Sequence, residues 1–141
     1  MTEINIHHGV ADPLAYACRL LLKAQQRGSR VAVVAEPEAL ERLDLQLWTF
    51  DATSFVPHVR VREPAPAALA DTPISLVERT GDALHHEVLV NLGPQIAPGF
   101  ESFERLFEIV GRDDEARAAG RTRLRHYRSR GYQISFHEVR P

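Results

Sequence analysis

The stretch RVAVVAE, residues 30–36, decides the fold of this chain. Its middle is an unbroken apolar run rich in β-branched valine, without the polar and apolar alternation of a half-exposed strand. Such runs are typical of strands in parallel sheets, where helices cover both faces. The stretch therefore predicts an inner strand of an α/β protein.

A strand and a helix come directly before this stretch. Residues 4–10, INIHHGV, alternate loosely as a strand does, and Asp12 followed by Pro13 signals the start of a helix. Gly28 marks the end of that helix. A strand, a helix and a second strand in this order predict a parallel pair joined by a right-handed crossover. Residues spaced by three and four positions form the apolar face of the helix: Leu14, Ala17, Cys18 and Leu21.

The rest of the chain continues the alternation of helices and strands. A second helix is expected from near Pro37 to about Trp48, and residues 63–73, rich in proline and alanine, read as an extended surface connection. A helix is expected from Asp113 to just before Gly131. Three further strands are expected, at residues 73–78 (PISLVE), 86–93 (HEVLVNLG) and 132–139 (YQISFHEV).

A further helix is predicted at residues 100–110, FESFERLFEIV, because apolar residues recur there at helical spacing: Phe100, Phe103, Phe107 and Val110. The whole pattern predicts one domain over residues 1–141. Its expected fold is a three-layer α/β/α sandwich with a mostly parallel open sheet, Rossmann-like but without a nucleotide-binding loop.

Composition places the chain among ordinary globular proteins. Its 141 residues suffice to bury a core, and the charged fraction of 26% is typical. No apolar run approaches the roughly 18 residues of a membrane-spanning helix, and the start MTEINIHHGV lacks the features of a signal peptide. The lone Cys18 excludes an internal disulfide and fits a reducing compartment. We therefore predict a cytoplasmic protein without membrane association.

The sequence shows no motif of catalysis or cofactor binding. The turn HHGVADP holds a single glycine, so it offers neither Gly-x-Gly-x-x-Gly nor a phosphate loop. The adjacent pairs His7-His8 and His85-His86 would point to opposite faces of a strand, so neither clamps one metal ion. No Gly-x-Ser-x-Gly elbow occurs, and Cys18 falls on an apolar helix face, where an inert core thiol is expected. We predict no catalytic residue, metal site or cofactor.

Arginine is concentrated near the C-terminus. Seven of the sixteen arginines lie between Arg112 and Arg130, and Lys23 is the only lysine. At about 100° per residue, four of them fall within about 80° along one edge of the predicted helix. We call these four the arginine seam: Arg117, Arg121, Arg125 and Arg128. Leu124 borders the seam, and Gly120 would leave a dent beside it.

A run of charged residues on a helix usually faces solvent and pairs with acidic neighbours. This run, in contrast, destabilises the helix that carries it. Arg117, Arg121 and Arg125 repeat at i, i+4, where each like-charge pair destabilises a helix by about 0.2–0.5 kcal/mol. Asp113 can relieve only the first of them. The pattern therefore indicates an anionic partner, either phosphates or an acidic peptide with an apolar end.

A second unusual stretch is LWTFDATSFVPH, residues 47–58, which holds the only tryptophan where a connecting loop is expected. Exposed aromatic side chains on a loop require a cover. Two alternatives stay open for Trp48: it packs onto the core as the end of an amphipathic helix, or another protein chain covers it. Phe55 follows a polar break in the sequence, which favours the second alternative for this residue, a cover by another protein chain. His58, after Pro57, is expected to be a hydrogen-bonding loop residue.

The same stretch, with its LW, an interval and SFVPH, resembles the chi subunit of bacterial DNA polymerase III. YRSRGYQISF, residues 127–136, matches the Tyr-Arg-x-x-Gly-aromatic ending of that family. The length and the order of elements agree over essentially the whole chain. The resemblance implies a non-catalytic accessory of the replicase clamp loader. It also implies two partners, the psi subunit or another clamp-loader component, and the acidic C-terminal tail of single-stranded DNA-binding protein, which ends in phenylalanine.

The resemblance also assigns positions. The family's basic residues for tail binding fall on Arg117, Arg121 and Arg125, a row that Arg128 extends, and its pocket valine falls on Val110. Its pocket tyrosine falls on Leu124, a departure that removes a hydroxyl group and stacking surface. The psi-facing aromatic residues fall on Trp48 and Phe55.

Two rival functions stay open. A small nucleotide-dependent or nucleic-acid-processing enzyme of α/β fold would require a phosphate loop, and nucleotides would stabilise it. Direct DNA binding by the arginine-rich helix would give a bare oligonucleotide the same affinity as the tail peptide. The net charge of −2 argues against this second rival, so no strong nucleic-acid binding is expected.

Overall fold

The structure is a computed structural model that describes residues 1–49, 55–62, 69 and 71–140. Within these residues, the three α-helices are α1 (Pro13–Gln26), α2 (Pro37–Thr49) and α3 (Asp114–Ser129). Its strands are β1 (Glu3–Val10), β2 (Val31–Val34), β3 (His58–Val61), β4 (Ile74–Val77), β5 (Val88–Asn91), β6 (Arg105–Gly111) and β7 (Ile134–Glu138).

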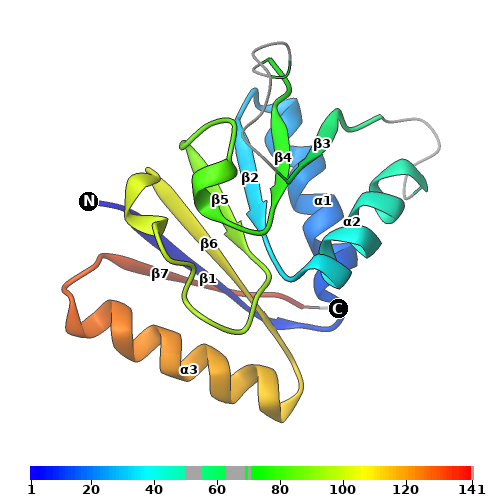
Figure 1. Cartoon of the computed structure of the whole chain (residues 1–141). Coiled ribbons are helices and arrows are strands. Elements are labelled where there is room, and N and C mark those ends of the chain that lie inside the picture. Colours follow the sequence, from blue (N-terminus) through cyan, green and yellow to red (C-terminus); the bar gives the residue numbers. More distant parts are fainter. Residues whose placement is uncertain (50–54, 63–68, 70, 141) are drawn as a thin grey trace.

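The strands form one sheet in which every pairing is parallel, in the order β3-β4-β2-β5-β6-β1-β7. Helices α1 and α2 lie together on one face, and α3 runs along the other face beside β6, β1 and β7 (Figure 1). The predicted α/β sandwich with a parallel open sheet is confirmed.

The first β-α-β unit forms as its local signals predict. The Asp12 carboxylate accepts a hydrogen bond from the Ala15 N–H at 3.2 Å, and Pro13 is the first residue of α1. All four residues of β2 are buried, as expected for a strand covered on both faces. Cys18 is fully buried, and this burial raises the pKa of its thiol to about 11, which fits the predicted inert core thiol.

The helix predicted at residues 100–110 is wrong. Phe100–Ser102 form a 3₁₀ turn, residues 103 and 104 form a bend, and residues 105–110 belong to strand β6 between β5 and β1. The side chains of β6 alternate: Leu106 and Val110 belong to the core under α3, whereas Ile109 belongs to the core under α1 and α2. Because both neighbours offer backbone hydrogen bonds along its length, pairing overrides the helical spacing of the phenylalanines.

The segment after α2 differs from the prediction at one point. His58 begins the edge strand β3, which sequence analysis did not predict, and so it does not lie in the loop. Residues 50–54 of the aromatic stretch, and most of the connection predicted at 63–73, lie outside the described residues. In the described part of the chain, no helix has the length and hydropathy needed to cross a membrane.

Candidate functional site

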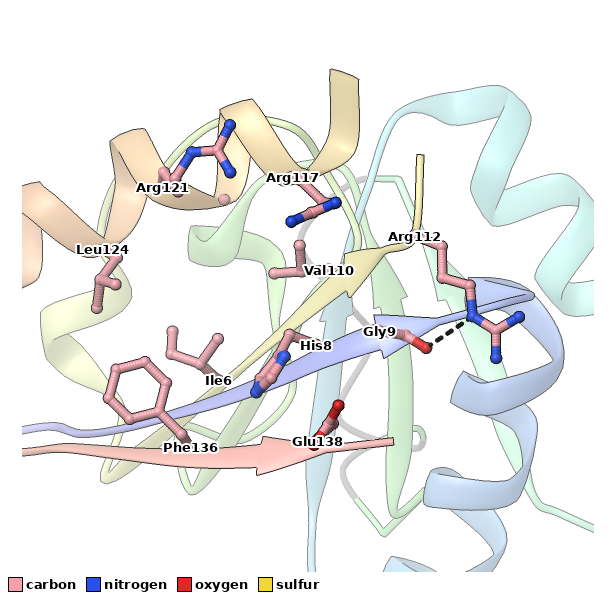
Figure 2. Close-up of a pocket in the computed structure, with 11 residues that line it drawn as sticks. Ile6, His8, Gly9, Val110, Arg112, Arg117, Arg121, Leu124, Phe136 and Glu138 are labelled. Atoms are coloured by element: carbon pink, nitrogen blue, oxygen red, sulfur yellow. Dashed lines mark hydrogen bonds between the residues drawn. The ribbon is translucent and has the colours of Figure 1, made fainter. Parts of the chain in front are cut away.

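A groove of about 390 Å³ lies between α3 and the neighbouring strands β1, β6 and β7. It gathers four of the predicted site residues, Val110, Arg117, Arg121 and Leu124, from β6 and α3. Figure 2 shows the side chains that face it. Besides these four, the lining comprises Ile6, His8, Gly9, Arg112, Gly120, Phe136 and Glu138.

Gly120 sets the distance between α3 and the sheet. A Cβ atom at this position would lie 2.9 Å from Val110 Cγ1, closer than real carbon contacts allow. The absence of a side chain therefore lets the helix approach the end of β6, at a cost in helix propensity of about 1 kcal/mol relative to alanine. The side chain of Val110, on β6, thus fills the dent predicted at Gly120.

One end of the groove is apolar. Ile6, Leu124 and Phe136 come from β1, α3 and β7, and Figure 2 shows them together on one side of the view. Ile6 and Phe136 are register partners on adjacent strands, which places their side chains next to each other on the same face. Phe136 is 51% exposed, so this end presents phenyl surface to solvent.

The other end is basic. Arg112 follows β6, and its Nε donates a hydrogen bond to the Gly9 carbonyl at 3.2 Å, drawn as the dashed line in Figure 2. Among the described residues, no carboxylate forms an ion pair within 4.0 Å of Arg112, Arg117 or Arg121. The groove therefore offers guanidinium groups to an anion. Glu138 also lines it and would oppose a second negative charge.

The remaining residues of the arginine seam lie outside the lining of the groove. The Nη2 of Arg125 donates to the Thr122 hydroxyl oxygen at 3.3 Å on the helix surface. The guanidinium carbon of Arg128 lies 5.7 Å from the ring centroid of Phe136, a cation–π contact. The structure thus brings Arg117 and Arg121 together in the groove, keeps Arg125 on the exposed surface and places Arg128 against Phe136.

A buried polar network holds α3 in place, and sequence analysis missed it. Arg123 Nε donates to Glu108 Oε1 at 2.9 Å, and Arg123 Nη1 donates to the Pro94 carbonyl at 2.6 Å. The Tyr127 hydroxyl and Asn91 Nδ2 also donate to the Glu108 carboxylate. Burial raises the pKa of Glu108, and the Arg123 charge opposes that rise. The available signal was a glutamate inside the apolar run of β6.

An aromatic patch lies on a separate surface, at the end of α2. Trp48 is 59% exposed, Phe55 is 56% exposed, and their ring centroids are 5.2 Å apart. Of the two alternatives for Trp48, packing onto the core is therefore wrong, and Leu47 turns inward instead. Leu45, 69% exposed on the same helix, is a further exposed apolar residue that sequence analysis missed.

His58 supports this patch from below. Its Nδ1 donates to the Val56 carbonyl at 2.6 Å, and its Nε2 lies 2.7 Å from Asp44 Oδ1, so its predicted hydrogen-bonding role is confirmed. The edge of the His58 ring packs against Trp48, with centroids 5.4 Å apart. The pair of hydrogen bonds fixes the imidazole and so fixes the surface on which Trp48 rests.

The two adjacent histidine pairs, His7-His8 and His85-His86, lie in different parts of the fold. The His7 ring contacts the Tyr16 hydroxyl on the α1 side of the sheet, whereas His8 lines the groove on the α3 side. His86 Nδ1 lies 2.7 Å from the Ser102 hydroxyl, and its ring stacks on Phe103. The opposite directions of His7 and His8 are those expected of neighbouring residues on a strand, whereas His85 and His86 precede β5 and do not lie on a strand.

A further hollow of about 360 Å³ lies at the carboxyl ends of β2 and β5, where open α/β sheets commonly bind nucleotides. The charged side chains that line it are the carboxylates of Glu36 and Glu78. Phosphate groups would be repelled there, so this hollow does not favour a nucleotide.

The fold and the groove together define a class of protein: an open parallel α/β sheet protein in which a groove beside α3 suits an acidic ligand with an apolar end. Comparison with known proteins gives the family. The family described as "DNA polymerase III chi subunit, HolC" matches residues 1–135. This chain belongs to the DNA polymerase III chi subunit family, as its resemblance predicted.

Three relatives carry the name DNA polymerase III subunit chi. The chain is 37% identical to that of Pseudomonas aeruginosa over 134 residues, which cover 92% of this chain and 90% of the relative. It is 30% identical to that of Haemophilus influenzae, over 87% of this chain and 85% of the relative. It is 27% identical to that of Escherichia coli, over 84% and 80% respectively. These names place the family in DNA replication.

Proposed function

We propose that this chain is a non-catalytic accessory subunit of the DNA polymerase III clamp-loader complex. In this function it binds the acidic C-terminal tail of single-stranded DNA-binding protein during DNA replication. The observation that carries the proposal is the groove between α3 and the sheet. Arg112, Arg117 and Arg121 line it without a described carboxylate partner, and its far end is apolar. A tail with several carboxylates and a terminal phenylalanine complements both ends.

The chemistry of capture follows from the two ends. Guanidinium groups bind carboxylates through charge-assisted hydrogen bonds, in the best case bidentately. Because these arginines are exposed, salt should weaken the attraction, with a screening length of about 10 Å at 0.1 M. Burial of a phenylalanine side chain adds about 1.5–3 kcal/mol that salt does not screen. The apolar end would therefore distinguish the tail from an arbitrary polyanion.

The aromatic patch supports a second part of the proposal. We assign Trp48 and Phe55, with Leu45 beside them on α2, to the interface with the psi subunit or another clamp-loader component. These side chains are large, apolar and more than half exposed, and aromatic residues of this kind are frequent anchors at the centres of protein interfaces. The patch and the groove lie on different elements, so one chain could hold both partners at once.

Calorimetric titration with an acidic peptide that ends in phenylalanine tests the tail-binding part. Arg121→Ala should weaken binding roughly tenfold or more, because a hydrogen bond to a charged group contributes about 1.5–3 kcal/mol. Arg42→Ala, an exposed arginine on α2, is the matched control and should leave the affinity unchanged. Equal affinities of the wild-type protein and the Arg121→Ala variant would refute the assignment. Equal affinity for a bare oligonucleotide would favour direct DNA binding instead.

A further inference from the structure

We propose that Phe136, on the edge strand β7, is a specificity-determining residue of the groove and provides the aromatic surface on which the partner's terminal ring packs. This inference rests on the proposed function. Leu124, which the helix contributes at the apolar end, has no aromatic ring. Among the described residues that line the groove, Phe136 is the one that carries a phenyl ring.

The exposure of Phe136 calls for an explanation. All of β7 except its first residue is exposed, and the neighbours of Phe136 on this strand, Ser135 and His137, are polar. Phe136 nevertheless presents 51% of its surface to solvent beside Ile6 and Leu124. A partner that covers the ring would remove this apolar surface from water, which favours binding.

Arg128 orients the ring. Its guanidinium carbon lies 5.7 Å from the centroid of the ring, which itself lines the groove. His8 contacts the same ring edge-on, with centroids 6.4 Å apart. Arg128 therefore acts through Phe136 and is a positioning residue. This role explains why Arg128 belongs to the arginine seam although it does not line the groove.

The position of Phe136 also sets the direction of the bound segment. Figure 2 shows Phe136 and Leu124 at the left of the view, Arg117 near the middle and Arg112 at the right. A terminal ring against Phe136 places the preceding residues of the segment along α3, toward its N-terminal end. The carboxylates of an acidic tail would then run past Arg121 and Arg117 toward Arg112. The reverse direction would bring the terminal ring among guanidinium groups and leave the apolar end empty.

A double-mutant cycle between protein and peptide tests the inference. The wild-type protein and Phe136→Ala are each titrated with an acidic peptide that ends in phenylalanine and with the same peptide ending in alanine. We expect Phe136→Ala to lower the affinity for the phenylalanine peptide roughly fivefold to tenfold, the range that aromatic contacts support. The affinity for the alanine peptide should stay the same. His137→Ala is the matched control, because His137 is the next residue on β7, is exposed and packs against His7 rather than lining the groove.

Three further variants separate an aromatic role from a merely structural one. Phe136→Tyr should retain the preference for the phenylalanine peptide, whereas Phe136→Leu should lose most of it. Arg128→Ala should reduce that preference as well, and not only the overall affinity. Circular dichroism and thermal unfolding establish that each variant is folded.

The outcomes distinguish this inference from the proposed function. If the wild-type protein binds neither peptide, or if Arg121→Ala has no effect, the proposed function fails and the inference fails with it. If binding depends on Arg121 and on the terminal phenylalanine, but Phe136→Ala changes neither affinity, the role of Phe136 is overturned while the proposed function stands. An equal loss for both peptides would also overturn it.

Discussion

Arg123→Ala should destabilise the fold strongly, although Arg123 lies within a helix whose other arginines are mostly exposed. Its side chain is almost fully buried against Glu108, which is itself buried completely. The substitution removes the 2.9 Å contact with Glu108 and the 2.6 Å hydrogen bond to the Pro94 carbonyl. Loss of one member of a buried ion pair costs about 3–5 kcal/mol, because the other charge stays buried without compensation. That is a large part of the roughly 5–15 kcal/mol that stabilises a typical domain.

Urea unfolding followed by circular dichroism measures the effect. With a slope of about 2 kcal/mol per M, a loss of 3–5 kcal/mol lowers the midpoint by roughly 1.5–2.5 M. The matched control is Arg125→Ala, two positions further along the same helix, where the side chain is exposed. Its free energy of unfolding should change by no more than about 0.5 kcal/mol.

The double variant Glu108→Leu/Arg123→Met separates the two contributions to the loss. If the uncompensated carboxylate causes most of it, replacement of both charges by apolar side chains should recover much of the stability. Equal urea midpoints for Arg123→Ala and Arg125→Ala would refute the reasoning, because the burial of Arg123 would then carry no energetic weight.

Three further predictions concern other residues. Burial, with the nearby His137 and His8, lowers the pKa of His7 from 6.5 to about 4, so stability should fall as the pH drops from about 6.5 toward 4, where the unfolded chain takes up a proton that the folded chain does not. His7→Gln should flatten this part of a pH profile of urea midpoints, and an equally steep profile in the variant would contradict the prediction. Glu138→Gln should strengthen binding of the acidic peptide about twofold to threefold in calorimetry, in line with exposed charge pairs, and weaker binding would contradict the assigned groove. Asp44→Ala should release His58 and shift the fluorescence of Trp48, the only tryptophan, and an unchanged emission spectrum would argue against this support.

Local signals in the sequence predict much of the fold and part of the candidate site. The apolar run of residues 30–36, the cap at Asp12 and the stop at Gly28 each act within a few residues, so no distant contact is needed to interpret them. The same holds for α3, where Asp113 caps the helix and the chain turns at Gly131. Helical geometry also predicted the edge on which the arginine seam lies, and the family resemblance came from two short stretches.

Contacts between distant segments decided the rest. Residues 100–110 have apolar positions that fit both a helix and a strand, and only pairing with β1 and β5 selects the strand. Arg123 and Arg125 are the same residue type on one helix. Arg123 is nevertheless buried in an ion pair with Glu108 of β6, whereas Arg125 is exposed to solvent. Phe136 meets Leu124 only because β7 pairs with β1 beneath α3. The physical reason is that periodicity and capping are local, whereas burial and charge pairing depend on which segments the sheet brings together.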